Sequence, residues 1–244
     1  MGGQDPDRGK LDALVVAAHP DDGEIAVGGT LLLLRDAGWR LGIVDLTAGE
    51  LGTRGTVEDR RREAAAAGDL LGLSLRVNLG LPDGGVADGP EPRAALAQLL
   101  RRHRPEVLLA HHGEDLHPDH AAAGALARRA WYLAGLPRLA ERVGGAPAWR
   151  APRLFHFPGH LPVEPTLVVD VGAVWERKVE LIRCYASQLT PAHPGDDGSH
   201  FLFGADLLAR AETRARYWGE RIGRRYGEPL WHAGPLPADK ILPP

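Results

Sequence analysis

Short apolar runs alternate with helix-length segments through the first half of this 244-residue chain. The runs that predict buried strands are 11–18, 41–46, 75–79 and 107–110. The segments that predict helices are 25–37, 57–71, 92–103 and 118–133. This alternation is typical of parallel β-α-β units joined by right-handed crossovers. We therefore predict an α/β fold, with a doubly wound, mostly parallel, Rossmann-like sheet and helices on both faces.

The second half of the chain is less regular and predicts a smaller C-terminal α/β extension. Its expected strands and helices are 154–157, 167–171, 174–185 and 205–222. A segment rich in proline, glycine and aspartate, 190–199, is expected to be a loop. The chain length suits one domain. We predict a disordered or tag-like N-terminus at 1–10, a single catalytic domain at 11–228 and a proline-rich extended tail at 229–244.

Composition argues against several classes of partner. The net charge is −3 and lysine and arginine are spread along the chain, so no basic face for nucleic acid is expected. All apolar runs are shorter than the ~20 residues that a membrane span needs. The polar start of the chain lacks the apolar core of a signal peptide, so a cytoplasmic protein is expected. The single cysteine, Cys184, allows no intrachain disulfide and is expected to be a buried helix residue.

Two His/Asp clusters follow two of the predicted strands. The first is His19-Pro20-Asp21-Asp22-Gly23-Glu24 and the second is His117-Pro118-Asp119-His120. Ligands of doubly wound sheets bind beyond the carboxyl ends of the strands, so both clusters should lie on one rim. Either cluster alone could be a turn that caps a helix. Two clusters on one rim predict a shared divalent metal, Zn²⁺ or else Mn, Fe, Co or Ni, and hence a metal-assisted hydrolase.

Neighbouring side chains on an extended chain point in opposite directions, so the members of each cluster should differ in role. One of Asp21 and Asp22 would bind the metal, and the other would take a proton from the attacking water. One of His117 and His120 would bind the metal, and the other, positively charged, would stabilise the oxyanion and protonate the leaving group. Asp119 could hold the second nitrogen of that histidine. The residues alone leave the order within each pair open.

The same motifs resemble those of the LmbE-like (PIG-L) zinc-dependent N-acetylglucosamine deacetylases. The resemblance covers 11–227 and includes the two clusters, Gly28-Gly29-Thr30 and the glycine-rich segment 49–55. It implies hydrolysis of the acetamide on a glucosamine unit, a small-molecule amino-sugar substrate and a homo-oligomer, with a hexamer as the candidate assembly. The site roles that it implies are metal binding by His19, Asp22 and His120, general base catalysis by Asp21, and oxyanion stabilisation by His117.

Within that family the chain is most similar to the branch that deacetylates N-acetylglucosaminyl-malate in bacillithiol biosynthesis. The shared features are 52–56, 78–84, 178–188 and 223–228. That branch often has an arginine just before the second His motif, where this chain has Leu116. Other substrates therefore stay open: a mycothiol precursor, chitobiose or a thiol-conjugate amide. A non-catalytic sugar- or nucleotide-binding module is the alternative of a different class, although no complete dinucleotide fingerprint is present.

Three further residues are predicted to bind the substrate. Arg54 lies in the glycine-rich loop after a strand, where a guanidinium can hold hydroxyls or a carboxylate at two points. Tyr185 and Gln188 would line the sugar pocket. Glu24 would either orient a metal ligand or favour the N-terminus of the following helix. His111, at the end of the fourth strand, could support the metal ligands, but a structural role is the favoured expectation.

Overall fold

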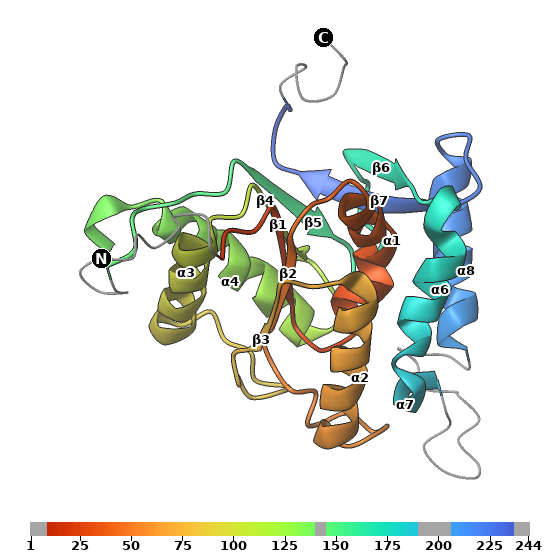
Figure 1. Ribbon diagram of the computed structural model, residues 1–244, viewed down its shortest axis with the longest axis horizontal. Coiled ribbons are helices and arrows are strands. Elements are labelled where there is room, and N and C mark those ends of the chain that lie inside the picture. Colours follow the sequence, from red (N-terminus) through yellow and green to blue (C-terminus); the bar gives the residue numbers. More distant parts are fainter. Residues whose placement is uncertain (1–8, 140–144, 190–205, 237–244) are drawn as a thin grey trace.

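The computed structural model describes residues 9–139, 145–189 and 206–236 (Figure 1). At its centre lies a seven-stranded sheet in the order β3-β2-β1-β4-β5-β7-β6. The strands are β1 (Ala13–Ala17), β2 (Leu41–Asp45), β3 (Leu75–Asn78), β4 (Val107–His111), β5 (Arg153–Phe157), β6 (Leu167–Asp170) and β7 (Gly227–His232). Strand β7 runs antiparallel to both of its neighbours, β5 and β6, and every other pair of adjacent strands in the sheet is parallel. The predicted α/β fold with a mostly parallel sheet is confirmed.

Helices cover both faces of the sheet, as predicted. They are α1 (Asp22–Asp36), α2 (Val57–Leu71), α3 (Pro90–His103), α4 (Pro118–Ala134), α6 (Trp175–Arg183), α7 (Ala186–Leu189) and α8 (Leu207–Glu220), with 3-10 turns η1 (Pro137–Leu139) and η2 (Gly172–Val174). One face packs against α1, α2, α6 and α8, and the other against α3 and α4 (Figure 1). After β3 the chain returns to place β4 on the other side of β1. The switch point of the sheet therefore lies between β1 and β4.

Helix α2 begins and ends where its sequence predicts. The Thr56 hydroxyl accepts a hydrogen bond from the Asp59 N–H, and the Asp59 carboxylate accepts one from the Thr56 N–H. This reciprocal pair is a capping box. Gly72 ends the helix in the left-handed conformation, with a φ of 63°.

Other predicted helix boundaries differ from the structure. Helix α1 starts at Asp22 instead of 25, and α3 starts at Pro90 instead of 92. The predicted helix 174–185 corresponds to α6, which ends two residues early at Arg183, while residue 174 belongs to η2 and α7 is a separate short helix beyond the predicted end. Tyr185 lies between α6 and α7 with its side chain fully buried. The break therefore allows this residue to turn into the core, which periodicity alone could not reveal.

Helix α1 is kinked at Val27, whose φ of −130° and ψ of 18° are not helical. The N–H groups after the kink need acceptors, as at any helix N-terminus. The Glu228 carboxylate of β7 accepts from Gly29 N–H at 2.8 Å and from Thr30 N–H at 2.7 Å, and Lys178 of α6 pairs with it at 2.5 Å. A Cβ at Gly29 would lie 2.9 Å from a Glu228 oxygen, so glycine permits the close approach. The Gly-Gly-Thr motif thus serves the fold.

Strand β7 crosses the predicted domain boundary at residue 228. It lies between β5 and β6, so residues 229–232 belong to the sheet and not to a tail. Pro229 pairs with Val168 of β6, whereas β5 pairs only with residues 231 and 232. Because Pro229 does not pair with β5, its missing N–H removes no hydrogen bond to that strand. The prediction of an extended tail from residue 229 is therefore wrong for 229–232.

Two predicted segments cannot be compared with the structure. The loop at 190–199 lies outside the described residues, as does nearly all of the N-terminal segment 1–10. Cys184 lies at the end of α6 and is half-buried, whereas the sequence predicted a buried residue. Among the helices that the structure describes, none is both long and apolar enough to cross a membrane.

Candidate metal centre

The two His/Asp clusters meet at the carboxyl ends of β1 and β4, which are adjacent and parallel. Strand β1 leads into His19 and Asp22, while β4 ends at His111 and leads toward α4. His120 lies in the first turn of α4. The rings of His19 and His120 are 5.5 Å apart between centroids. The fold therefore brings together the residues that the sequence analysis expected on one rim.

His19, Asp22 and His120 form a compact donor group, with one ligand atom of each within 4.8 Å of the others. Asp22 lies between the two imidazoles. Its Oδ2 is 3.2 Å from His19 Nδ1, and its Oδ1 is 3.3 Å from His120 Nε2. Two imidazoles and one carboxylate form a donor set that binds zinc and similar transition metals. The chemistry and spacing of these atoms therefore fit a divalent metal ion.

Charges within this group shift its pKa values in opposite directions. Burial raises the pKa of Asp22, but its interactions with His120 and His111 together outweigh burial and hold this pKa well below its usual value. Burial lowers the pKa of His19, yet hydrogen bonds to Asp22 and Asp83 raise it to about 11. His120 follows the same pattern, because the charges of Asp22 and Asp115 outweigh burial and raise its pKa to about 9. In the metal-free protein both imidazoles therefore carry protons that a metal must displace.

Asp21 lies beside this donor group but outside it. It is the N-cap residue of α1, yet its side chain makes no capping hydrogen bond. Helix capping, the alternative explanation for the first cluster, is therefore not the role of this carboxylate. Its φ of 113° is strained for a residue with a Cβ, and such strain is concentrated at functional sites.

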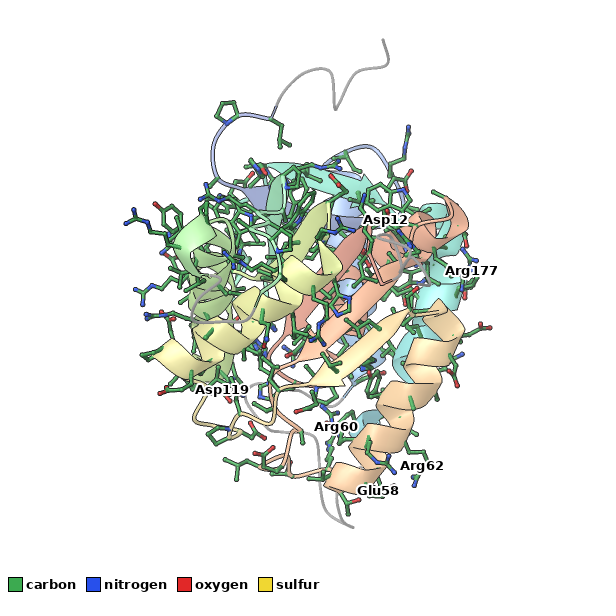
Figure 2. The ribbon with its side chains drawn as sticks, turned by 60° about the vertical axis from the view of Figure 1, so that its left-hand side comes forward. Asp12, Glu58, Arg60, Arg62, Asp119 and Arg177 are labelled. Carbon is green, nitrogen blue, oxygen red and sulfur yellow. The ribbon has the colours of Figure 1, made fainter. Side chains whose placement is uncertain are left out.

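Arg60 of α2 holds Asp21 in this position. Its Nη1 donates to Asp21 Oδ2 at 2.9 Å, and its Nη2 donates to the Pro20 carbonyl oxygen. Arg60 is buried, whereas Glu58 and Arg62 of the same helix are exposed (Figure 2). Burial raises the pKa of Asp21, against the charge of Arg60. A buried carboxylate with raised proton affinity beside a metal-donor group has the properties of a general base.

His117 is the N-cap residue of α4. Its Nδ1 accepts a hydrogen bond from the Asp119 backbone N–H at 3.2 Å. Burial, together with the charges of His120 and His19, lowers the pKa of His117. The lowered pKa favours a neutral ring in the metal-free protein, and because Nδ1 accepts a hydrogen bond, Nε2 is the nitrogen that can carry a proton. The positive charge expected on His117 stays a prediction for the metal-loaded protein.

The expectation that the Asp119 carboxylate holds His117 is wrong. This carboxylate accepts hydrogen bonds from the backbone N–H groups of Gly84 and Val86 at 2.7 and 3.1 Å. Its Oδ2 is 3.5 Å from His19 Nε2. The loop after β3 thus supplies partners that lie distant in sequence. His19, His117 and Asp119 also form a second set of donor atoms within the same 4.8 Å limit.

Arg54 and Gln188, both predicted to bind the substrate, lie against each other. An Arg54 guanidinium N–H donates to the Gln188 carbonyl oxygen at 3.1 Å, and the Gln188 side-chain amide donates to the Arg54 carbonyl oxygen at 2.8 Å. Both residues are half-buried. This contact joins the loop before α2 to α7, so the two predicted residues act as one structural unit.

Tyr185, the third predicted substrate residue, faces the interior. Its hydroxyl donates to Glu24 Oε1 at 2.8 Å and accepts from Arg76 at 3.1 Å. Arg76 also donates to Glu24 at 2.6 Å and to both carboxylate oxygens of Asp45 at 2.8 and 3.0 Å. The expectation that Tyr185 lines a sugar pocket therefore does not fit the structure. Glu24 belongs to the same buried network and anchors the first turn of α1.

Two carboxylates that the sequence analysis did not assign touch the donor group. Asp83 Oδ1 is 3.0 Å from His19 Nε2, and Asp115 Oδ1 is 3.5 Å from His120 Nδ1. Carboxylates in such positions fix the orientation of histidine ligands. Both residues follow strand ends, and Asp83 also lies in segment 78–84 of the family resemblance, so a sequence signal existed for each of them.

His111 also reaches the donor group. Its Nε2 is 3.2 Å from Asp22 Oδ2, and its ring stacks on that of His120 with centroids 4.2 Å apart. Burial and the charge of His120 lower its pKa to about 4. A neutral, fully buried ring at this position supports the two metal-donor side chains, which fits the alternative role of His111 and not the favoured, purely structural one.

Comparison with known proteins connects this geometry to a family. A family model, PIG-L: GlcNAc-PI de-N-acetylase, matches residues 14–131. The 4-oxalmesaconate hydratase of Pseudomonas putida is 31% identical over 195 residues, which cover 72% of this chain and 73% of that protein. The diacetylchitobiose deacetylase of Thermococcus kodakarensis is 28% identical over 227 residues, covering 88% of this chain and 80% of that protein.

A conserved protein from Thermus thermophilus has a similar crystal structure, with a TM-score of 0.81 and 42% identity over 93% of this chain and 96% of that chain. The segment matched by the family model contains His19, Asp21, Asp22, His117 and His120. The fold, the donor group and these similarities agree. The chain belongs to the PIG-L (LmbE-like) deacetylase family.

Proposed function

We propose that this protein is a metal-dependent hydrolase that removes the N-acetyl group from an N-acetylglucosamine conjugate, with N-acetylglucosaminyl-malate as the first candidate substrate. Family membership supports the reaction class, and one relative is by name a deacetylase of diacetylchitobiose. The malate glycoside is the first candidate because the sequence resembles the branch of the family that acts on it. The observation that carries the proposal is the buried Asp21 carboxylate beside, but outside, the His19, Asp22 and His120 donor group.

His19, Asp22 and His120 would hold the metal, with Zn²⁺ as the expected ion. When bound, such an ion polarises a carbonyl and lowers the pKa of a coordinated water to about 7. Asp83 and Asp115 contact the two histidines and would orient their rings.

Asp21 accepts a proton from the attacking water. Arg60 pairs with its Oδ2, which leaves Oδ1 for the proton. Water oxygen bonds to the acetyl carbon, the carbon–nitrogen bond breaks, and the proton on Asp21 passes to the departing amine nitrogen. The products are acetate and the free amino sugar, and no oxidant or other co-reactant is needed.

His117 stabilises the developing charge on the acetamide oxygen. Its ring lies 4.8 Å from that of His19 and 4.7 Å from that of His120, between centroids. With Nδ1 occupied by the Asp119 N–H, the Nε2–H is the donor. One such oxyanion donor typically contributes about 3–4 kcal/mol to transition-state stabilisation.

Acetate release tests the proposal directly. Metal-loaded protein is incubated with N-acetylglucosaminyl-malate, diacetylchitobiose and the inositol glycoside of N-acetylglucosamine, and acetate is measured enzymatically. We expect release from at least one substrate and the highest kcat/KM on the malate glycoside. Absence of acetate from all three would refute deacetylation, and a preference for a neutral glycoside would refute the malate assignment.

Hydration of a carbon–carbon double bond is the second candidate function. It is favoured by the 31% identity to a hydratase. In that reaction a water proton goes to the substrate carbon, so the same base could serve. Loss of 4-oxalmesaconate absorbance without acetate release from any sugar would support hydration over deacetylation.

A further inference from the structure

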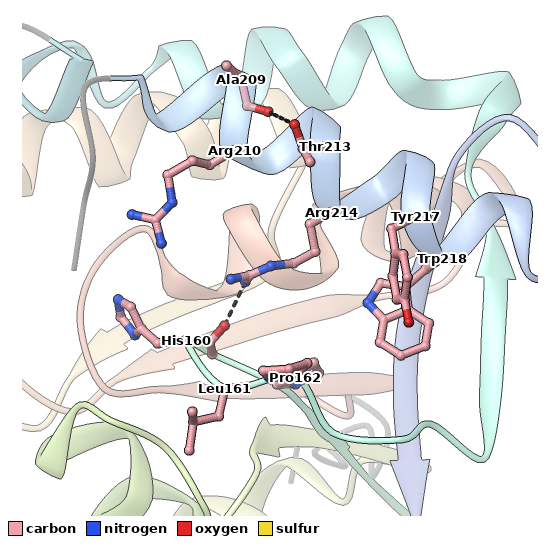
Figure 3. Close-up of a pocket in the computed structure, with 11 residues that line it drawn as sticks. His160, Leu161, Pro162, Ala209, Arg210, Thr213, Arg214, Tyr217 and Trp218 are labelled. Atoms are coloured by element: carbon pink, nitrogen blue, oxygen red, sulfur yellow. Dashed lines mark hydrogen bonds between the residues drawn. The ribbon is translucent and has the colours of Figure 1, made fainter. Parts of the chain in front are cut away.

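A pocket of about 500 Å³ lies between α8 and the segment 158–162 that follows β5 (Figure 3). Its walls are mostly apolar and include Leu161, Pro162, Tyr217 and Trp218. Tyr217 is 53% exposed, so an aromatic ring faces outward at this surface. None of the residues that line it belongs to the His19, Asp22 and His120 donor group. The pocket is therefore a separate feature whose role the hydrolytic chemistry does not explain.

His160 connects this pocket to the donor group. It lines the pocket, its Nδ1 is 3.2 Å from Asp115 Oδ1, and its ring stacks near that of His120 with centroids 5.1 Å apart. The ring of His117 lies 6.2 Å away. His160 therefore borders both the pocket and the donor group.

Two guanidinium groups mark the end of the pocket near His160. Arg210 and Arg214 lie one helical turn apart on α8, and both extend toward His160 (Figure 3). Arg214 is half-buried and donates to the Gly159 carbonyl oxygen at 2.6 Å. Within the described ranges, no carboxylate forms an ion pair with it. Desolvation lowers the pKa of Arg214, as does the charge of Arg210, with only partial compensation by Asp115.

This arrangement favours an anion. A partly desolvated arginine without a carboxylate partner next to a second arginine gains energy when a negative charge binds. A guanidinium presents paired N–H donors that match the two oxygens of a carboxylate. The apolar walls beside it would accept the carbon skeleton that carries the carboxylate.

We propose that this pocket binds the glycosidic substituent of the substrate, and that this substituent carries a carboxylate held by Arg214 and Arg210. The inference rests on the proposed deacetylation of the malate glycoside and assigns the recognition of its carboxylates to named residues of this pocket. It assigns Arg214 as a specificity-determining residue on α8, distant in sequence from both His/Asp clusters. The malate branch often has an arginine at the position of Leu116. In this chain Arg214 would supply the positive charge that Leu116 lacks.

Steady-state kinetics on two glycosides test the proposal. The variants are Arg214→Gln and Arg214→Lys, and the substrates are N-acetylglucosaminyl-malate and the uncharged methyl glycoside. Arg216→Gln is the matched control, because Arg216 lies on the same helix but pairs with Glu212 outside the pocket. Loss of one charge-assisted hydrogen bond should lower the kcat/KM ratio of malate to methyl glycoside by about 10- to 100-fold in Arg214→Gln, mainly through KM. Arg214→Lys should lose less, and Arg216→Gln should keep the ratio.

An unchanged ratio in Arg214→Gln, or an equal loss on both glycosides, overturns the proposal. If Arg214→Gln does not fold, Tyr217→Ala removes a wall of the pocket at an exposed position and should lower the same ratio. A changed solution mass in Arg214→Gln would show that the pocket is a contact between copies of the chain, which also overturns the proposal.

Direct binding separates this proposal from the deacetylase assignment. L-malate is titrated into metal-loaded wild type, Arg214→Gln and Arg216→Gln by calorimetry. Weaker binding in Arg214→Gln alone supports the pocket, whereas malate bound only at the metal would bind all three proteins equally and overturn it. This comparison holds even if the wild type releases no acetate from any glycoside, a result that would refute the proposed reaction itself.

Discussion

At the scale of single residues, Asp21 and Asp22 show how adjacent carboxylates acquire different properties. Asp22 lies between imidazoles, whose charges lower its pKa. Asp21 has a strained backbone and contacts Arg60, and burial raises its pKa. The difference comes from their surroundings, since the two side chains are chemically identical.

Replacement of the proposed base separates proton transfer from metal binding. In Asp21→Asn the side chain can no longer accept a proton, so kcat should fall by about 10²- to 10⁴-fold. Metal content, measured by atomic emission, should equal that of the wild type because Asp21 is outside the donor group. Asp22→Asn is the matched control and should lose metal. Loss of metal in Asp21→Asn would contradict the assigned roles.

Metal affinity should increase with pH. The pKa of His19 is raised to about 11 and that of His120 to about 9 in the metal-free protein, so both are protonated near neutrality. For each proton that the metal displaces, the metal affinity should rise about tenfold per pH unit, as long as the pH is below the pKa of that histidine. Competition with a chromophoric chelator between about pH 6.5 and 8.5 measures this slope. A flat profile would show that the imidazoles are not protonated before metal binds.

The same shifts affect the metal-free protein. A histidine whose pKa is raised by folding contributes stability that is complete below its unfolded value and lost as pH rises through its folded value. Metal-free protein should therefore become less stable above about pH 6.5, the ordinary histidine pKa. Bound metal should remove this dependence, because it replaces the protons.

At the scale of secondary-structure elements, the contact between β7 and α1 joins the last described strand to the first helix. Glu228 accepts from the N–H groups that the α1 kink exposes, and Lys178 neutralises it. Helix α1 begins at the donor group, so the last described strand supports the helix that carries Asp22. A sequence-based boundary at residue 228 separates parts that the structure shows to be interdependent.

Removal of this carboxylate should destabilise the fold. Glu228→Ala leaves the ammonium of Lys178 buried without a partner, a change that typically costs about 3–5 kcal/mol. Urea unfolding followed by circular dichroism measures the loss. The double variant Glu228→Ala/Lys178→Met should recover part of it, whereas Glu212→Gln, at an exposed ion pair, should change stability by less than about 1 kcal/mol. Equal stability of Glu228→Ala and wild type would contradict this account.

At the scale of the whole molecule, the donor group lies where the direction of winding changes, between β1 and β4. The second α/β part continues the same sheet through β5, β7 and β6. Helix α8 of that part supplies the pocket beside His160. One part thus carries the reacting groups and the other the proposed recognition of the substrate.

The assembly of the chain in solution is a further prediction. The family resemblance implies a homo-oligomer, with a hexamer as the candidate assembly. Light scattering coupled to gel filtration should therefore give a mass that is a multiple of the monomer value of 26.2 kDa, and six times that value for a hexamer. A mass equal to one chain at micromolar concentration would refute this expectation.

Local sequence was sufficient for the general architecture of the first half. The apolar runs and the helix-length segments predicted the strands and helices that place His19, Asp22 and His120 on one rim, because parallel strands share their carboxyl edge. The predicted helix ends were less accurate where a contact with a residue distant in sequence determines the end of the helix. The helix predicted at 174–185 ends at Arg183, and Tyr185 leaves it to reach Glu24, a contact that no neighbouring residue signals.

The sequence by itself determined the α/β class, the pairing of the two clusters and the chemistry of their side chains. Only the tertiary structure decided which partner each side chain contacts: Asp119 turns to the backbone of 84–86 and not to His117, and a proline-containing segment enters the sheet as β7. Strand and helix periods are set by neighbours along the chain, whereas these contacts join residues far apart in sequence. Such contacts depend on how the whole chain packs, and a local pattern contains no record of that packing.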